Sequence, residues 1–132
     1  MSLHIHIARL ATPSATLVRH LQLQIAPGNV HTLMGESGSG KSSVLAAVCG
    51  TLDAGLQCEA EVTLNGQRID TLPTQARKVG ILFQEDLLFA HMTVRENLLF
   101  AVPPGPRAGR EARVAQALAD LELPGLGAAD PA

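Results

Sequence analysis

The sequence predicts an α/β fold with an antiparallel β portion at its N-terminal side. Three observations predict it: alternating apolar segments in the first 34 residues, a glycine-rich loop followed by a helical pattern, and two later segments with helical spacing. The chain has 132 residues, of which 46% are hydrophobic and 17% charged. This composition favours a folded domain of ordinary size over a disordered chain.

Three short segments in the first 34 residues are predicted to be β-strands, at residues 3–7, 21–26 and 29–34. The first two alternate apolar and polar residues, which is the pattern of a half-buried strand. Pro27-Gly28 supplies a turn into the third, "NVHTLM". His4 and His6 alternate with apolar residues, so we expect them to face solvent rather than to bind a metal.

Residues 35–43, "GESGSGKSS", follow that apolar run and precede the helical pattern of residues 42–52. They match G-x-x-x-x-G-K-[ST], in which glycines let successive backbone N–H groups turn towards an anion. We predict that Val44, Leu45 and Val48 share one helical face. Because a strand, a loop and a helix are the context that this motif requires, we interpret the stretch as a phosphate-binding loop rather than a flexible linker.

The chemistry of the loop assigns a role to its residues. Lys41 can reach the outer phosphates of a nucleotide and the Ser42 hydroxyl can ligate Mg²⁺, while the start of the helix adds its N–H groups and dipole. The predicted nucleotide-binding residues are Gly35, Glu36, Ser37, Gly38, Ser39, Gly40, Lys41, Ser42 and Ser43.

Two more β elements are predicted after this helix. Residues 59–64 and 67–70 flank Asn65-Gly66 and should form a hairpin. Residues 78–83, "KVGILF", are almost continuously apolar, as in a strand that is buried on both faces.

Two helices are predicted in the last forty residues. Thr93 and Glu96 form a capping-box pattern that opens a short helix in 93–102. The proline-rich residues 103–106 should interrupt it, and a second helix follows over 111–123, before Pro124-Gly125. Its apolar face is expected to consist of Val114, Ala117, Leu118 and Leu121.

Composition also excludes several classes of function. The net charge of −2 without a basic run argues against nucleic acid as a partner. No apolar stretch approaches the roughly 20 residues of a membrane span, and the N-terminus lacks a secretory signal pattern, so we expect a cytoplasmic protein. Cys49 and Cys58 are expected to be reduced and structural.

Beyond these patterns, the sequence resembles the ATP-binding cassette subunits of ABC transporters, and among them most of all the bacterial import-type subunits. The resemblance rests on residues 27–43, 64–73 and 77–102, and it runs from about residue 3 to the end. It implies a P-loop NTPase core with an N-terminal antiparallel β subdomain. It also implies ATP and Mg²⁺ as cofactors, with a phosphate loop at 35–43, a Q-loop segment at 80–92 and the start of a helical subdomain at 93–126.

The resemblance implies further roles and partners. Gln84 would be the Q-loop glutamine that senses Mg²⁺ and the γ-phosphate, so Lys41 and Gln84 would act in catalysis, and Ser42 and Gln84 at the metal. A second ATP-binding subunit would complete a dimer. A membrane-spanning subunit would dock around Gln84 to Met92, which would place the protein peripherally on the inner face of the cell membrane.

That docking prediction has independent support in the sequence. Leu87, Leu88, Phe89 and Met92 form an apolar cluster, bracketed by Glu85, Asp86 and Arg95. Apolar anchors with charges at the rim suit a short helix from another protein, whereas the alternative is that these residues pack within their own domain.

The sequence also departs from the family. It lacks an aromatic residue around Leu10 to Thr12, where the family usually stacks adenine, and it lacks the Leu-Ser-Gly-Gly-Gln signature, the Asp-Glu strand and the switch histidine. We therefore expect a cassette that is incomplete at its C-terminal side and that binds ATP without hydrolysing it alone.

Two other functions remain open from the sequence. The first is a small P-loop kinase in which Glu85 or Asp86 would act on Mg²⁺ or substrate. The second is a nucleotide-binding remnant without turnover, which would bind ATP and release no phosphate.

Overall fold

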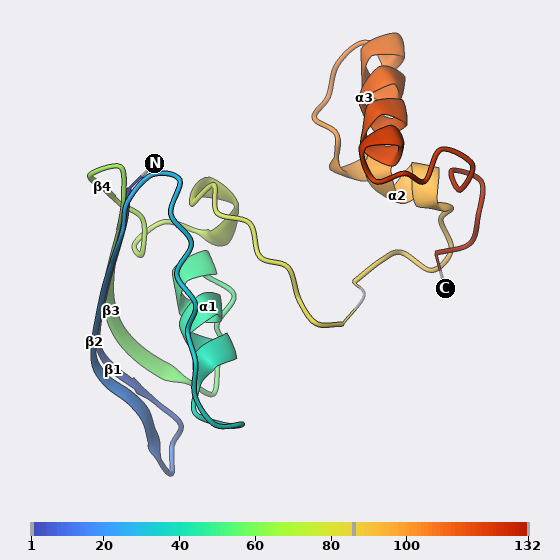
Figure 1. Cartoon of the computed structure of the whole chain (residues 1–132). Helices are drawn as coiled ribbons and strands as arrows, with labels where there is room; N and C mark the ends of the chain where they lie inside the picture. The colour runs from blue at the N-terminus through green and yellow to red at the C-terminus, as the bar shows by residue number, and fades with distance from the viewer. Residues whose placement is uncertain (1, 86, 132) are drawn as a thin grey trace. The chain divides into compact units, whose positions relative to one another are not determined.

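The computed structural model describes residues 2–85 and 87–131. These form two compact units, which divide between Leu82 and Phe83. Figure 1 shows the sheet and α1 in the first unit, and α2 and α3 in the second. Each unit is described by itself below. Asp86 lies outside the described residues.

The first unit is built on a four-stranded antiparallel sheet with the strand order β2-β1-β3-β4. Its strands are β1 (Leu3–Ala11), β2 (Thr16–Ile25), β3 (Gln57–Leu64) and β4 (Gln67–Arg68). In β1, Ile5 and Ile7 are buried while His4 and His6 are exposed. The predicted alternation and the solvent-facing histidines are therefore confirmed.

The core of this unit lies between the sheet and α1 (Lys41–Cys49), as Figure 1 shows. Its fully or nearly fully buried side chains are Ile5, Ile7, Leu10, Val44, Val48, Val62 and Ile69. Val44 and Val48 form the buried face of α1 as predicted, whereas Leu45 is 53% exposed, so its assignment to that face was wrong. Both cysteines are free, as expected.

The predicted hairpin is present, with Asn65-Gly66 joining β3 to β4. Asn65 has a φ of 53° and Gly66 a φ of 79°, which are the two positive values that this turn requires. The Asn65 side chain also accepts a hydrogen bond from the backbone N–H of Ser2 at 2.8 Å. This bond ties the N-terminal end of β1 to the turn.

Asp70 ends this hairpin and makes part of its stability pH-dependent. Its Oδ1 accepts a hydrogen bond from the Val62 N–H at 2.9 Å, and both its oxygens accept from Arg68 Nε at 3.1 Å. Burial alone would raise the pKa of Asp70, but the hydrogen bonds from Arg68 and Val62 and the charge of Arg68 outweigh it and lower the pKa.

A lowered pKa stabilises the fold above the pKa of the unfolded carboxyl, about 3.9, and the stabilisation is lost as pH falls through the folded value. We therefore expect the free energy of unfolding of the wild type to fall more steeply between pH 5 and pH 2 than that of Asp70→Asn, measured by urea titration. Glu59→Gln, on the exposed face of β3, should keep the wild-type slope. Equal slopes for Asp70→Asn and the wild type would contradict this role.

Two predicted strands are absent, although the structure describes every residue of both. Residues 29–34 and 78–83 have no strand conformation, and Val30, Met34 and Leu82 are 90%, 85% and 98% exposed. A strand forms only where a neighbour satisfies its N–H and C=O groups. Within the described residues the sheet consists of β1 to β4, and neither segment pairs with it.

The second unit contains α2 (Val94–Ala101) and α3 (Arg107–Asp120). The predicted capping box is confirmed: the Glu96 N–H donates to Thr93 Oγ1 at 3.3 Å, and the Thr93 N–H donates to Glu96 Oε2 at 2.8 Å. These bonds satisfy N–H groups that have no partner inside the helix, and they stabilise the start of α2.

α3 contacts α2 through its buried apolar face and through an ion pair. Val114 and Leu118 are buried as predicted, but Leu121 follows the end of α3 and is 67% exposed, so its place on this face was wrong. Glu111 pairs with Arg95 at the start of α2. Within the described residues, no helix combines the length and the apolar character needed to cross a membrane.

Candidate phosphate-binding site

The glycine-rich loop leads directly into α1, whose N-cap is Gly40. Gly38 and Gly40 have φ values of 79° and 90°, which side chains rarely adopt. A Cβ on Gly40 would lie 3.1 Å from the Leu17 Cβ, and a Cβ on Gly35 would lie 2.9 Å from Ser39 Oγ. The glycines therefore allow a tight loop that lies against β2.

Lys41, the first residue of α1, folds back over this loop. Its Nζ donates to the carbonyl oxygens of Gly35 at 2.8 Å and Glu36 at 2.6 Å, and it lies 3.5 Å from Ser39 Oγ. The loop is closed further by the Ser39 N–H, which donates to the Glu36 carbonyl at 3.2 Å. The ammonium group is thereby held inside the curve of the loop.

The other predicted loop residues are accessible to a ligand. Glu36, Ser37, Gly38, Ser39 and Ser42 are exposed, and Gly40, Lys41 and Ser43 are half-buried. The first N–H groups of α1 point in the direction of the loop, as those of every helix N-terminus do, and they carry the positive end of the helix dipole. The structure thus brings residues 35–43 together into one surface that suits an anion.

Gln84 is exposed and is part of the second unit, whereas the phosphate loop is part of the first. Within residues 2–85 and 87–131, no three His, Cys, Asp or Glu side chains come together to hold a metal ion. The metal role assigned to Ser42 and Gln84 stays a prediction.

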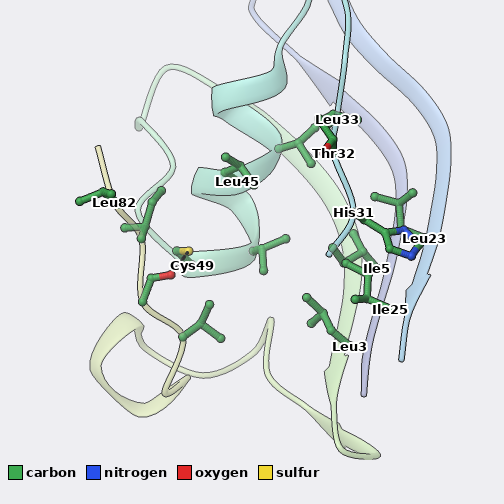
Figure 2. Close-up of a pocket in the computed structure, with 15 residues that line it drawn as sticks. Leu3, Ile5, Leu23, Ile25, His31, Thr32, Leu33, Leu45, Cys49 and Leu82 are labelled. Atoms are coloured by element: carbon green, nitrogen blue, oxygen red, sulfur yellow. Dashed lines mark hydrogen bonds between the residues drawn. The ribbon is translucent and has the colours of Figure 1, made fainter. Parts of the chain in front are cut away.

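A separate cavity of about 350 Å³ lies behind α1, on the side of the sheet. Figure 2 shows Leu45 and Cys49 of α1 opposite Leu3, Ile5 and Leu23 of the sheet, and Leu33 and Leu82 are among the other residues that line the cavity. Its walls are mostly apolar, with His31 and Thr32 as polar lining residues, and they include none of residues 35–43. The cavity is therefore distinct from the candidate phosphate site.

The predicted docking cluster is largely on the surface of the second unit. Leu87, Leu88 and Phe89 are 67%, 52% and 40% exposed, while Met92 is half-buried. Phe89 also stacks edge-to-face on Phe100, with ring centroids 4.8 Å apart. The cluster is therefore mostly exposed, although Phe89 also packs within its own unit.

Asn97 holds the backbone beneath this cluster, and we did not predict it from the sequence. Its Oδ1 accepts from the Phe89 N–H at 2.9 Å, and its Nδ2 lies 3.1 to 3.2 Å from the carbonyls of Phe89, Met92 and Thr93. The only signal available was an amide side chain one turn after a helix N-cap, which is compatible with many roles.

Comparison with known proteins gives one consistent family. A sequence model described as "ABC transporter" matches residues 18–131. The chain is 40% identical over 124 residues to an uncharacterized ABC transporter ATP-binding protein of Escherichia coli (strain K12), covering 93% of the chain and 57% of that protein.

Two other relatives are named as import ATP-binding proteins. A thiamine import ATP-binding protein of Cereibacter sphaeroides is 35% identical over 96% of this chain and 54% of its own length. A sulfate/thiosulfate import ATP-binding protein of Thermosynechococcus vestitus is 40% identical over 83% of this chain and 32% of its own length. The chain thus spans about half, or less, of the length of these relatives.

Proposed function

The chain belongs to the ABC transporter family, and we propose that it is part of an ATP-binding subunit that binds Mg-ATP to power solute transport. The observation that carries the proposal is the closed loop at residues 35–43, with Lys41 folded over it at the start of α1. The family match favours this function over the small P-loop kinase that the sequence left open.

The loop suits a chain of phosphates for three physical reasons. Its glycines allow backbone N–H groups to turn towards an anion, the α1 dipole attracts negative charge, and the Lys41 ammonium adds a full positive charge. When bound, Mg²⁺ neutralises phosphate oxygens. The exposed Ser42 hydroxyl fits such an ion, and we propose that the Gln84 side chain is a second ligand for it.

Isothermal titration calorimetry of the wild type tests this proposal. We expect Mg-ATP to bind more tightly than ADP, and AMP to bind at least tenfold more weakly than ATP, because each lost phosphate removes charge that the loop recognises. Inorganic tripolyphosphate with Mg²⁺ should also bind, and EDTA should weaken ATP binding. Binding of AMP as tight as that of ATP would contradict a phosphate-binding loop.

We propose that the exposed cluster at Leu87 to Phe89 docks a membrane-spanning subunit. Three features support it: the apolar side chains are accessible, Asn97 fixes the backbone that carries Phe89, and Glu85 and Arg95 are exposed near the same segment of the chain. An apolar centre with a charged rim suits an amphipathic helix. This would place the protein at the cytoplasmic face of the membrane.

A charge in this cluster should prevent docking. In the intact transporter, co-expressed with its membrane-spanning subunit, Phe89→Asp and Leu87→Asp should each lose that subunit in an affinity pull-down while keeping Mg-ATP binding. Leu121→Asp is the control, because Leu121 is 67% exposed in the same unit but outside the cluster. Retention of the subunit by Leu87→Asp, or loss of nucleotide binding with it, would make the cluster a structural feature.

We further propose an import-type transporter in which a second ATP-binding subunit forms a dimer with the first. The support is that two relatives are named as import proteins, for thiamine and for sulfate or thiosulfate. These different solutes leave the cargo of this protein open. Pairing of subunits would be measured by light scattering of the intact protein with and without Mg-ATP.

A further inference from the structure

The helix that carries the phosphate loop has few stabilising features of its own. α1 has nine residues, and isolated helices shorter than about 12 residues are marginal in water. Within the described part of the chain, no side chain caps its N-terminus, no acidic residue lies in its first turn and no basic residue lies in its last turn. The N–H groups at the N-terminal end of α1 can therefore bond only to the loop or to a ligand.

The opposite end of α1 is held by one arginine from a distant segment. Arg77 Nη1 donates to the carbonyls of Ala47 and Val48 at 2.8 and 3.0 Å. The last carbonyls of a helix have no partner within it and carry the negative end of its dipole. Arg77 supplies the positive charge that the last turn of α1 lacks.

The same guanidinium also binds the segment that precedes it. Nη2 donates to the Asp70 carbonyl at 2.8 Å, and Nε donates to the Leu72 carbonyl at 2.9 Å. Thr74 adds a second link, because its Oγ1 donates to the Gly50 carbonyl at 2.5 Å. The end of α1 is thus joined to residues 70–77 by one rigid, planar group and one hydroxyl.

We propose that Arg77 is a positioning residue for the phosphate site, an inference that rests on the proposed nucleotide binding. By fixing the C-terminal end of α1, Arg77 lets the N-terminal end stay uncapped and ready for phosphate. α1 spans only about 14 Å at 1.5 Å per residue, so a tilt or fraying at one end displaces Lys41 and Ser42 at the other. The planar guanidinium with its several N–H donors, rather than its positive charge alone, performs this function.

Two variants of Arg77 test the proposal by calorimetry with Mg-ATP and with Mg-tripolyphosphate. Arg77→Gln removes the charge, and Arg77→Lys keeps the charge but cannot reach four carbonyls. We expect both to weaken the two ligands equally, by about tenfold, at a temperature at which circular dichroism shows them folded. The two ligands should lose affinity equally because both bind the displaced phosphate loop, whereas contacts with the base, which only ATP makes, are not affected.

Gly66→Ala is the matched control. Gly66 lies in the turn between β3 and β4 with a φ of 79°, and a Cβ there would meet nothing within 4 Å, so the substitution strains the same unit without a contact on α1 or Arg77. It should lower the unfolding midpoint and keep wild-type affinity. Equal affinity losses in Gly66→Ala and Arg77→Lys, or none in Arg77→Lys, would overturn the inference. Failure of the wild type to bind tripolyphosphate would instead refute the proposed function itself.

Discussion

Lys41→Ala is expected to weaken Mg-ATP binding about a hundredfold, which corresponds to about 2.8 kcal/mol. Hydrogen bonds to charged groups are worth about 1.5–3 kcal/mol, and under the proposed function the ammonium contacts only the phosphates of the ligand. The substitution also removes the donors that close the loop onto the carbonyls of Gly35 and Glu36. Both effects act on the phosphate end of the ligand.

Calorimetry with ATP, tripolyphosphate and adenosine separates these contributions. Tripolyphosphate should lose as much affinity as ATP, whereas any weak binding of adenosine should be unchanged. Arg113→Ala is the charge-matched control, because it removes one exposed positive charge from α3 in the other unit and should leave all three affinities unchanged. Equal losses for ATP and adenosine would show that Lys41 only supports the fold.

Gly50→Ala is expected to reduce the free energy of unfolding by about 3 kcal/mol. Gly50 ends α1 with a φ of 81°, where a side chain costs about 1–2 kcal/mol. Its Cβ would also lie 2.7 Å from Arg77 Nε and 2.8 Å from Arg77 Cζ. An arginine side chain can usually move away, but four hydrogen bonds hold this one, so overpacking adds about 1–3 kcal/mol.

Gly66→Ala is the matched control for this prediction. Gly66 has a φ of 79°, and a Cβ there would meet nothing within 4 Å. It therefore carries the same backbone strain without the contact, and it should cost about 1 kcal/mol. Urea unfolding of both variants measures the difference, which is attributable to the contact with Arg77. Equal losses would mean that the Arg77 side chain moves freely.

Elements with local signals were predicted well. The capping box at Thr93 and Glu96 and the turn at Asn65-Gly66 depend on residues within four positions of each other, so the sequence contains all of their chemistry. The same is true of the loop at residues 35–43 and the start of α1. The alternation of apolar and polar residues was also enough to predict β1, because one face of that strand packs on the core and the other faces solvent.

Features that depend on distant partners were not predictable in this way. The apolar residues 78–83 indicate burial but not what buries them, and without paired neighbours they form no strand here. Arg77 immediately precedes this segment and gives no local signal, yet it makes four hydrogen bonds to carbonyls up to 30 residues away.

The sequence by itself determined the loop at residues 35–43 and the start of α1, and it carries the proposal of phosphate binding, because glycines, a lysine and a serine in that spacing can be read without knowledge of their surroundings. Only the tertiary structure decided how the helix behind the loop is held. The carbonyls at the end of α1 need donors, and the fold brings them Arg77, which follows the end of α1 by 28 residues in the sequence. Such pairings depend on the path of the chain, which no short pattern contains.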